Sequence, residues 1–343
     1  MFIKINNKLS TNKNKRPLII AEISGNHAGN KKRFLNLIKR AFVCGADLVK
    51  IQTYEPIDIT LNKKDEKFKI MAGPWKNMYL WDLYRKACTP FNWHKEAFKI
   101  AKTFNKKIFS SPFSIRAVDH LEKFKCPIYK IASFEITDLK LINYIASKKK
   151  KIILSTGMST ISEIKRAIKI INKFHNDIVI LHCISDYPTE IKDSNLKKIL
   201  YLKKIFPKYE IGLSDHTNGI STSIIASHLG ISFIEKHFNL DNMKTADSSF
   251  SIDPIQLKEL SEAIRYLFSK SKKNNILQRK NFFLRRSIFS IKNIKKNDRI
   301  SEANIDTFRP KIGICASDFF KILNKKATRA IKKNEPIFYS DIK

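Results

Sequence analysis

The sequence predicts a (β/α)8 barrel followed by a small, mostly β domain, and three features of the chain support that fold class. Short apolar runs of strand length alternate with longer amphipathic segments over about 250 residues, the usual span of such a barrel. Each run is apolar at nearly every position at its start, as expected of parallel strands buried on both faces. Polar residues follow at the end of each run. A doubly wound sheet is the alternative, but no GxGxxG motif follows any of the runs.

Eight strand candidates occur in order, and segments with apolar residues at helical spacing, such as STISEIKRAIKIINKF, separate them. Because the C-terminal strand ends of a barrel surround its active site, we expect the polar residues at these ends to converge. The strand candidates span residues 17–24, 46–52, 106–112, 128–133, 151–157, 177–185, 210–216 and 233–238.

A long insertion interrupts the alternation between the second and third predicted strands, at about residues 55–95. All three tryptophans of the chain lie there, Trp75, Trp81 and Trp93. Connections of this length inside a compact domain are usually functional. We therefore expect a lid or a wall beside a substrate, with some of the tryptophans packing the insertion onto the barrel.

Beyond about residue 270 the pattern changes to a polar, basic stretch and then to short strand-like runs separated by turns. We therefore divide the chain into a barrel domain at 1–270, a linker at 271–282 and a β-rich domain at 283–343. The last segment is short, and we expect it to have too little apolar content for a core of its own.

The overall composition narrows the cellular setting and the partners. The five cysteines are odd in number and form no CxxC pair, so we expect a reducing cytoplasm and no disulfide framework. No apolar run has the length of a signal peptide or a membrane span, so we expect no membrane partner. The net charge of +35 raises the alternative of nucleic-acid binding. Lysine is spread along the whole chain without clustered aromatics, however, so we expect no nucleic-acid partner.

Two histidines are the candidate metal ligands. His216 and His237 end consecutive predicted strands, and the ends of adjacent barrel strands lie close together. Two imidazoles placed in this way suit a divalent ion such as Mn²⁺, Co²⁺ or Zn²⁺, whereas either histidine alone would be read as a hydrogen-bonded wall residue. Glu22, at the end of the first strand and therefore beside the eighth, is a candidate third ligand or orienting base.

A second group of strand-end residues is basic and hydroxylic. Lysine at the end of a buried strand needs a partner, because an unpaired buried ammonium is costly. Two cations and several short donors suit a phosphorylated carboxylate. The residues of this group are Lys50, Lys130, Ser111, Ser133, Ser155, Ser185 and Ser214.

Eight short motifs resemble, in order, the strand-end motifs of the sialic acid synthase family. The C-terminal segment resembles the antifreeze-like (SAF) domain of that family, so the resemblance implies a TIM barrel followed by a SAF domain. Members condense phosphoenolpyruvate with a 2-acetamido hexose, giving a nonulosonic acid and phosphate. The motifs are AEISGNHAG, VKIQTY, FSSPF, YKIAS, ILSTGM, HCISDYPT, GLSDHT and IEKHF.

Two features resemble the pseudaminic acid synthases within that family. They are the insertion GPWKNMYLWDLYRKACTPFNWH and the QTY of VKIQTY, where neuraminate enzymes have QTH. This resemblance implies a transferase that condenses phosphoenolpyruvate with 2,4-diacetamido-2,4,6-trideoxy-L-altrose and water. An aromatic wall suits this comparatively apolar sugar. N-acetylneuraminate or legionaminate synthesis is the alternative within the family.

The resemblance also implies roles for individual residues. His216 and His237 would bind a divalent metal ion, Mn²⁺, Co²⁺ or Mg²⁺. Ser111 stands where threonine is common, and Ser185 stands where N-acetylneuraminate synthases have asparagine, which weakens that assignment. The implied catalytic residues are Glu22, Lys50, Lys130 and Tyr187, and the implied substrate-binding residues are Gln52, Ser111, Ser133, Ser155, Ser185, Ser214, Asp247 and Arg309.

Arg309, in the sequence TFRP, lies in the C-terminal segment. The resemblance implies a domain-swapped homodimer in which this arginine completes the active site of the partner subunit. A 3-deoxy-octulosonate type of synthase on the same barrel would lack the C-terminal domain, so its presence favours the sialic acid synthase family.

Overall fold

The computed structural model describes residues 16–269 and 281–343, which belong to two compact units, residues 1–269 and 270–343. The predicted linker at 271–282 lies outside the described residues up to residue 280. Within the described ranges, no helix is both long enough and apolar enough to cross a membrane.

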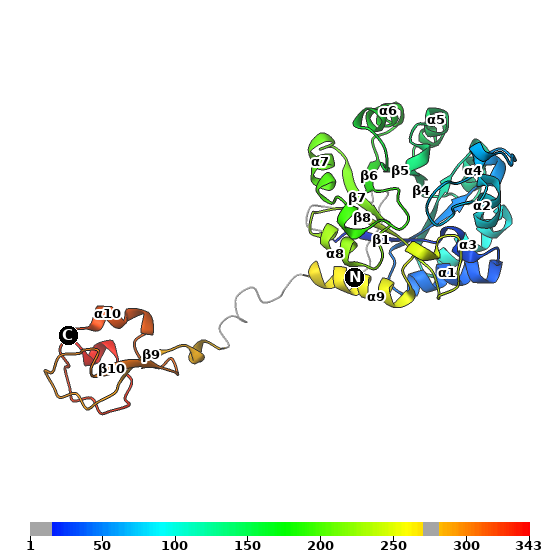
Figure 1. The fold of residues 1–343 in the computed structure, drawn as a ribbon. Coiled ribbons are helices and arrows are strands. Elements are labelled where there is room, and N and C mark those ends of the chain that lie inside the picture. The colour runs from blue at the N-terminus through cyan, green and yellow to red at the C-terminus, as the bar shows by residue number, and fades with distance from the viewer. Residues whose placement is uncertain (1–15, 270–280) are drawn as a thin grey trace. The chain divides into compact units, whose positions relative to one another are not determined.

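The first unit is a closed barrel of eight parallel strands in sequential order, with helices around it (Figure 1). All eight predicted strands are confirmed. β1 closes the barrel against β8, and Glu22 lies opposite His237 in this pairing. The strands are β1 (Leu18–Glu22), β2 (Leu48–Thr53), β3 (Lys107–Pro112), β4 (Ile128–Ile131), β5 (Lys151–Ser155), β6 (Ile178–Cys183), β7 (Glu210–Asp215) and β8 (Phe233–His237).

The helices bury one face against the barrel, and several begin at residues suited to that position. Thr160 forms a capping box with Glu163 at the start of α6, and Asp253 caps α9, whose first residue is Pro254. The helices of this unit are α1 (Lys31–Val43), α2 (Leu80–Ala87), α3 (His94–Thr103), α4 (Ile115–Glu122), α5 (Leu139–Ser147), α6 (Ile161–Ile171), α7 (Lys197–Ile205), α8 (Ser221–Ser227) and α9 (Pro254–Leu267).

The barrel core changes character along the strands. Every residue of β5 and β6 is buried, and most of them are isoleucine, leucine or valine. Glutamate, lysine, serine and histidine replace these apolar residues toward the C-terminal strand ends and are still buried. Because a buried charge without a partner is costly, these polar ends must satisfy one another. They therefore mark the candidate site.

The register between β7 and β8 decides which strand-end residues face inward. Ser214 pairs with Glu235, and Asp215 pairs with Lys236. Since neighbouring residues of a strand point to opposite faces, Asp215 and Lys236 face the surrounding helices. They form a fully buried ion pair at 3.1 Å, and Ser223 of α8 donates to Asp215 at 2.6 Å. The expectation that all polar strand-end residues converge is therefore wrong for this pair.

The insertion after β2 forms short helical turns and α2, and its tryptophans have different environments. Trp93 packs against His27 and Phe34, with ring centroids 5.4 and 5.5 Å apart, so it fastens the insertion to the helical layer. Trp75 instead lies 5.4 Å from the ring of Tyr187, which follows β6. The insertion thus supplies both a packing residue and a residue near the strand ends.

The second unit contains the antiparallel strands β9 (Ser287–Ser290) and β10 (Ile305–Phe308) and the short helix α10 (Phe319–Ile322). The expectation that this segment lacks a core of its own is wrong. Branched side chains spaced along short strands and turns meet in its interior, so few apolar residues suffice. The core residues are Ile288, Ile294, Ile300, Ile305, Ile314, Ile322, Ala327, Ile331, Ile337 and Ile342.

Candidate active site

Glu235 of β8 lies at the centre of the polar strand ends. Its Oε1 atom lies 3.0 Å from Lys50 Nζ and 3.4 Å from Lys130 Nζ, and it accepts a hydrogen bond from Ser214 Oγ at 3.1 Å. All four side chains are buried. The barrel therefore brings the two candidate lysines, from β2 and β4, to one point. Glu235 was not among the candidate site residues. Its position two residues before His237, on the same face of the strand, is the signal that identifies it.

Glu22 extends this cluster toward β1. Its Oε2 lies 3.0 Å from Lys50 Nζ, and its Oε1 accepts a hydrogen bond from Gln52 Nε2 at 3.3 Å. Burial raises the pKa of Glu22 to about 7, although Lys50 opposes that shift. Burial also disfavours ionised Glu235, but Lys130 and Lys50 outweigh it and hold the pKa of Glu235 well below its ordinary value. The two carboxyl groups therefore differ, because the pKa of Glu22 is raised toward neutrality and that of Glu235 is lowered.

Two serines meet beside Gly157, in the turn after β5. Ser133 Oγ accepts a hydrogen bond from the Gly157 amide at 3.0 Å. A Cβ atom at Gly157 would lie 2.1 Å from Ser185 Oγ and 2.9 Å from Ser133 Oγ, so only glycine fits between these hydroxyls. The segments after β4 and β6 thus place their hydroxyls together, on either side of the glycine turn that follows β5.

Ser111 and Ser155 have hydroxyls that are buried and make no hydrogen bond within the described part of the chain. A buried hydroxyl without a partner costs about 1–3 kcal/mol. Such groups are satisfied when the oxygens of a ligand reach them. Their positions at the ends of β3 and β5 are those that the sequence assigned to the phosphorylated substrate.

The candidate metal ligands His216 and His237 lie side by side, with ring centroids 5.4 Å apart. The Nδ1 atom of His216 is 2.8 Å from the Ile184 carbonyl, which leaves Nε2 for a ligand bond. Nδ1 of His237 is buried, makes no hydrogen bond to any residue that the structure describes, and lies 3.8 Å from Asp247 Oδ2. Burial lowers the pKa of His237 well below its ordinary value, which keeps this imidazole neutral.

This pair fits a divalent ion with open coordination positions. The described residues hold no cluster of three or more His, Cys, Asp or Glu side chains arranged around one metal position. The buried nitrogen of His237 and Nε2 of His216 are imidazole donors of the kind that Mn²⁺ and Co²⁺ accept, and a bound ion would require both rings to be neutral. Burial keeps His237 neutral, whereas at His216 the effect of burial is outweighed by Cys183, which raises the pKa of that imidazole. Substrate or water oxygens would fill the remaining positions.

Aromatic rings form one wall of the site. Tyr187 lies 4.4 Å from His216 and 4.9 Å from Phe250, measured between ring centroids, and Phe250 lies 4.8 Å from His237. Trp75 of the insertion packs against Tyr187, and its Nε1 donates to the Ala246 carbonyl at 2.7 Å. Phe250 was not predicted, because a phenylalanine in a loop carries no signal of its own.

Two further groups were not predicted, the buried Cys183 and the partly buried Glu135. Cys183, at the end of β6, has its Sγ 3.8 Å from His216 Nδ1. Glu135, just after Ser133, has an enclosed Oε2 atom without a hydrogen bond in the described residues, and burial raises its pKa to about 7. Both residues follow the pattern of polar groups at strand ends, which is the signal that would have found them.

Arg309 lies in the second unit, directly after β10. It lines a cavity of about 380 Å³ together with Arg285, Arg286 and Cys315 of the same unit. The other candidate residues all belong to the barrel unit. Its closed strand order brings their backbone positions to the same end of the barrel.

Comparison with known proteins supplies the family. The profile of the NeuB family matches residues 37–275, and the SAF domain profile matches residues 285–343. A pseudaminic acid synthase of Helicobacter pylori is 43% identical over 95% of this chain and 98% of the relative. A pseudaminic acid synthase of Campylobacter jejuni is 40% identical over 96% and 98%.

A solved structure agrees with these sequence matches. The N-acetylneuraminic acid (sialic acid) synthetase of Leptospira borgpetersenii superimposes with a TM-score of 0.67 at 28% identity, covering 78% of this chain and 90% of that protein. With a family match over most of the barrel and relatives of at least 40% identity along nearly its whole length, the chain belongs to the NeuB family.

Proposed function

We propose that this protein synthesises pseudaminic acid by condensing phosphoenolpyruvate with 2,4-diacetamido-2,4,6-trideoxy-L-altrose and water, releasing phosphate. The observation that carries the proposal is the convergence of Lys50 and Lys130 beside a histidine pair and an aromatic wall. The pseudaminic acid synthases that match nearly the whole chain support the same assignment.

Phosphoenolpyruvate would bind at the lysine cluster. Glu22 and Glu235 neutralise Lys50 and Lys130, and the hydroxyls of Ser111 and Ser155 have no hydrogen-bond partner among residues 16–269 and 281–343. A phosphate and a carboxylate supply the anionic oxygens that these groups need. We infer that Ser133, Ser185 and Ser214 add donors on the same side of the site, while Gly157 leaves room for them.

The acceptor sugar would bind at the histidine side. A bound divalent ion supplies Lewis-acid polarisation of the open-chain aldehyde. Lys50 and Lys130 hold phosphoenolpyruvate so that its C3 faces the aldehyde carbon, which is the positioning that converts two bound substrates into reaction partners. Water then adds at C2, and cleavage of the C–O bond releases phosphate. Glu22, with its pKa near neutrality, orients that water or transfers its proton.

The aromatic wall supports a 6-deoxy, diacetamido acceptor over N-acetylmannosamine. Trp75, Tyr187 and Phe250 offer apolar faces for a methyl group and acetamido methyls, and Gln52 and Asp247 offer polar contacts. N-acetylneuraminate or legionaminate synthesis is the alternative in the same family. The serine at position 185 argues against N-acetylneuraminate.

The test is phosphate release from phosphoenolpyruvate with each acceptor in turn. We expect turnover that requires both sugar and metal, with the diacetamido altrose preferred over N-acetylmannosamine in kcat/KM by roughly 10–200-fold, the range for a few apolar contacts. Equal or reversed preference would move the protein to the neuraminate or legionaminate branch. No sugar-dependent release with any acceptor would refute the proposed reaction.

We further propose that the protein works in the cytoplasm as a domain-swapped homodimer in which Arg309 completes the site of the partner subunit. Its cysteines are all free thiols, which suits a reducing compartment. An arginine beside a cavity in the second unit has the donors to bind an acetamido carbonyl or a carboxylate of the ligand.

A further inference from the structure

The segment between β8 and α9, residues 239–253, brings two side chains to the histidine pair. Asp247 Oδ2 lies 3.8 Å from His237 Nδ1 and accepts a hydrogen bond from the Gly25 amide at 3.2 Å. The Phe250 ring packs on His237. We call this segment the β8–α9 loop. Its conformation decides whether Asp247 and Phe250 face the site.

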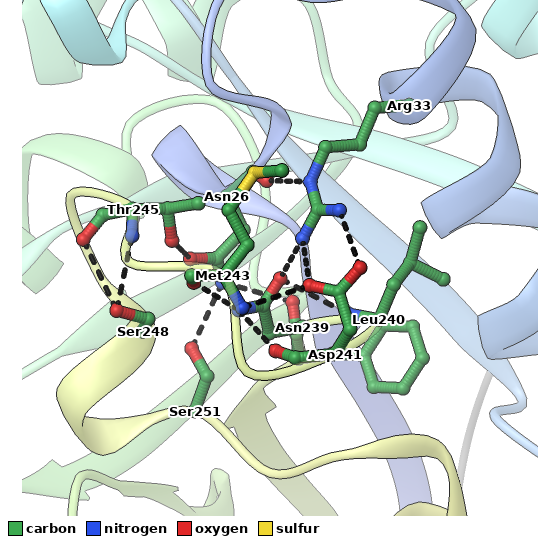
Figure 2. A network of polar contacts seen from close by, with 10 residues as sticks. Asn26, Arg33, Asn239, Leu240, Asp241, Met243, Thr245, Ser248 and Ser251 are labelled. Atoms are coloured by element: carbon green, nitrogen blue, oxygen red, sulfur yellow. Dashed lines mark hydrogen bonds and ion pairs between the residues drawn. The ribbon is translucent and has the colours of Figure 1, made fainter.

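One arginine from another element fixes this loop. Arg33, in the first turn of α1, donates from Nη1 and Nη2 to both carboxylate oxygens of Asp241 at 2.8 Å. Its Nη2 also donates to Asn239 Oδ1 at 2.6 Å, and its Nε donates to the Asn26 carbonyl at 2.9 Å. Figure 2 shows the guanidinium group joining these three residues. The planar guanidinium group of Arg33 therefore connects the start of the β8–α9 loop to the turn after β1.

The contacts continue from Asn26 to Asp247. The fully buried Asn26 amide donates from Nδ2 to the Phe238 carbonyl at 2.9 Å and to Ser251 Oγ at 2.8 Å (Figure 2). Ser251 Oγ in turn donates to the Asp247 carbonyl at 2.7 Å. Thr245 donates its hydroxyl to Asn26 Oδ1. Thr245 and Ser251 of the loop thus both hydrogen-bond to the Asn26 side chain, and Arg33 hydrogen-bonds to the Asn26 backbone carbonyl.

Close packing makes the site sensitive to small movements of this loop. A Cβ atom at Gly25 would lie 2.9 Å from Ala246 Cβ and 2.9 Å from Ala87 Cβ. The Trp75 indole also donates a hydrogen bond to the Ala246 carbonyl. The turn after β1, the insertion and the β8–α9 loop therefore touch at one point, and a shift of the loop would move the aromatic wall as well.

The energetics of the Arg33–Asp241 pair suit positioning better than stabilisation of the fold. The side chain of Asp241 is 53% exposed, whereas that of Arg33 is only 11% exposed. A pair with an exposed partner contributes little to folding stability, because water screens it. The forked geometry nevertheless restricts the loop to one arrangement.

We propose that Arg33 is a positioning residue for the acceptor sugar: it holds the β8–α9 loop so that Asp247 and Phe250 face the histidine pair. The identity of the ligand rests on the proposed function, but the holding of the loop does not. Loss of Arg33 weakens sugar binding while the phosphoenolpyruvate side, built from β2 to β7, keeps its geometry.

The experiment compares Arg33→Met, Arg33→Lys and Arg16→Met in the full-length protein. Arg16 is the matched control, because it makes a forked pair with Asp47 at 2.7 Å at the opposite end of the barrel, before β1 and β2. In Arg33→Met we expect the acceptor KM to rise about tenfold or more, since misplacement by about 1 Å is enough for such losses. The KM for phosphoenolpyruvate should stay within about twofold of wild type. Arg33→Lys keeps the charge but loses the planar, bidentate geometry, so its acceptor KM should lie between those of the wild-type protein and Arg33→Met.

Hydrogen exchange supplies a readout that is independent of the reaction. The amides of Leu240 and Met243 donate to Asn239 Oδ1 and Asp241 Oδ1, the atoms that Arg33 holds. We expect faster exchange at residues 239–253 in Arg33→Met and no change there in Arg16→Met. Unchanged exchange, an unchanged acceptor KM, or an equal effect in Arg16→Met would each overturn the proposal. If the wild-type protein turned over no diacetamido aldose, the proposed function would fail, and exchange alone would then decide whether Arg33 holds the loop.

Discussion

The buried ion pair between Lys236 and Asp215 offers the sharpest test of how the barrel holds its histidines. Both side chains lie on the outer face of their strands, each one residue before a candidate metal ligand. Lys236 is fully buried and Asp215 is almost so. The pair thus fixes the relative position of β7 and β8, and with it the spacing of His216 and His237.

We expect Lys236→Met to lower the free energy of unfolding by about 3 kcal/mol. Breaking a buried pair typically costs about 3–5 kcal/mol, because one charge is left without its partner. The lower end applies because Asp215 keeps hydrogen bonds from the Thr217 amide, the Thr217 hydroxyl and the Ser223 hydroxyl, at 2.9, 2.7 and 2.6 Å. For a barrel of this size the loss corresponds to a fall in Tm of roughly 6–12 °C.

The assay is thermal or urea unfolding of the full-length protein, followed by a fluorescence signal from the barrel tryptophans. Lys258→Met is the control, since Lys258 pairs with Glu262 at 3.9 Å on the exposed face of α9 and should change stability by less than about 0.5 kcal/mol. Adding Asp215→Asn to Lys236→Met removes the stranded charge and should restore much of the loss. The reasoning would be refuted if Lys236→Met were as stable as Lys258→Met. It would also be refuted if adding Asp215→Asn did not raise the free energy of unfolding above that of Lys236→Met.

Three further predictions concern the site and the second unit. EDTA should abolish turnover, and Mn²⁺, Co²⁺ or Mg²⁺ should restore it. His216→Ala and His237→Ala should each bind less metal, measured by elemental analysis, while remaining folded. Full turnover by rigorously metal-free protein would contradict this prediction. Arg309→Ala should raise the acceptor KM more than the phosphoenolpyruvate KM, and light scattering should show a homodimer; a fully active monomer would exclude the proposed domain swap. Because burial raises the pKa of Glu135 to about 7, its protonated form stabilises the fold below its unfolded pKa, and this contribution is lost as pH rises through 7. Unfolding at pH 5.5 and pH 8 should therefore differ more in the wild-type protein than in Glu135→Gln, and an equal difference in the two would refute the assignment.

The barrel and much of the site could be predicted from the sequence, because their signals are local. An apolar run such as KIILS or DIVILHC predicts a strand buried on both faces, and eight such runs separated by helices leave few fold classes other than a barrel. The neighbouring positions of His216 and His237 followed from strand order alone. Their side-by-side arrangement is what the structure shows.

The features that were missed depend on register and on long-range contacts. Strand alternation places Glu235 inside and Lys236 outside, but the apolar run before them gives no register by itself. Arg33 and Asp241 are separated by more than two hundred residues, and no local pattern links a basic first turn of a helix to a loop after β8. The core of the second unit was missed because its isoleucines are spread over short irregular segments without a period.

That self-contained core also affects how the protein can evolve. Because residues 287–342 bury their isoleucines against one another, this unit satisfies its own hydrophobic burial without help from the barrel, small as it is. A single recombination event near residues 270–283 can therefore replace it as a cassette without damaging the barrel interior. Given the role proposed above for Arg309, acceptor preference would then diversify through whatever side chain the incoming module places at that position, while the lysines and histidines of the barrel are inherited unchanged.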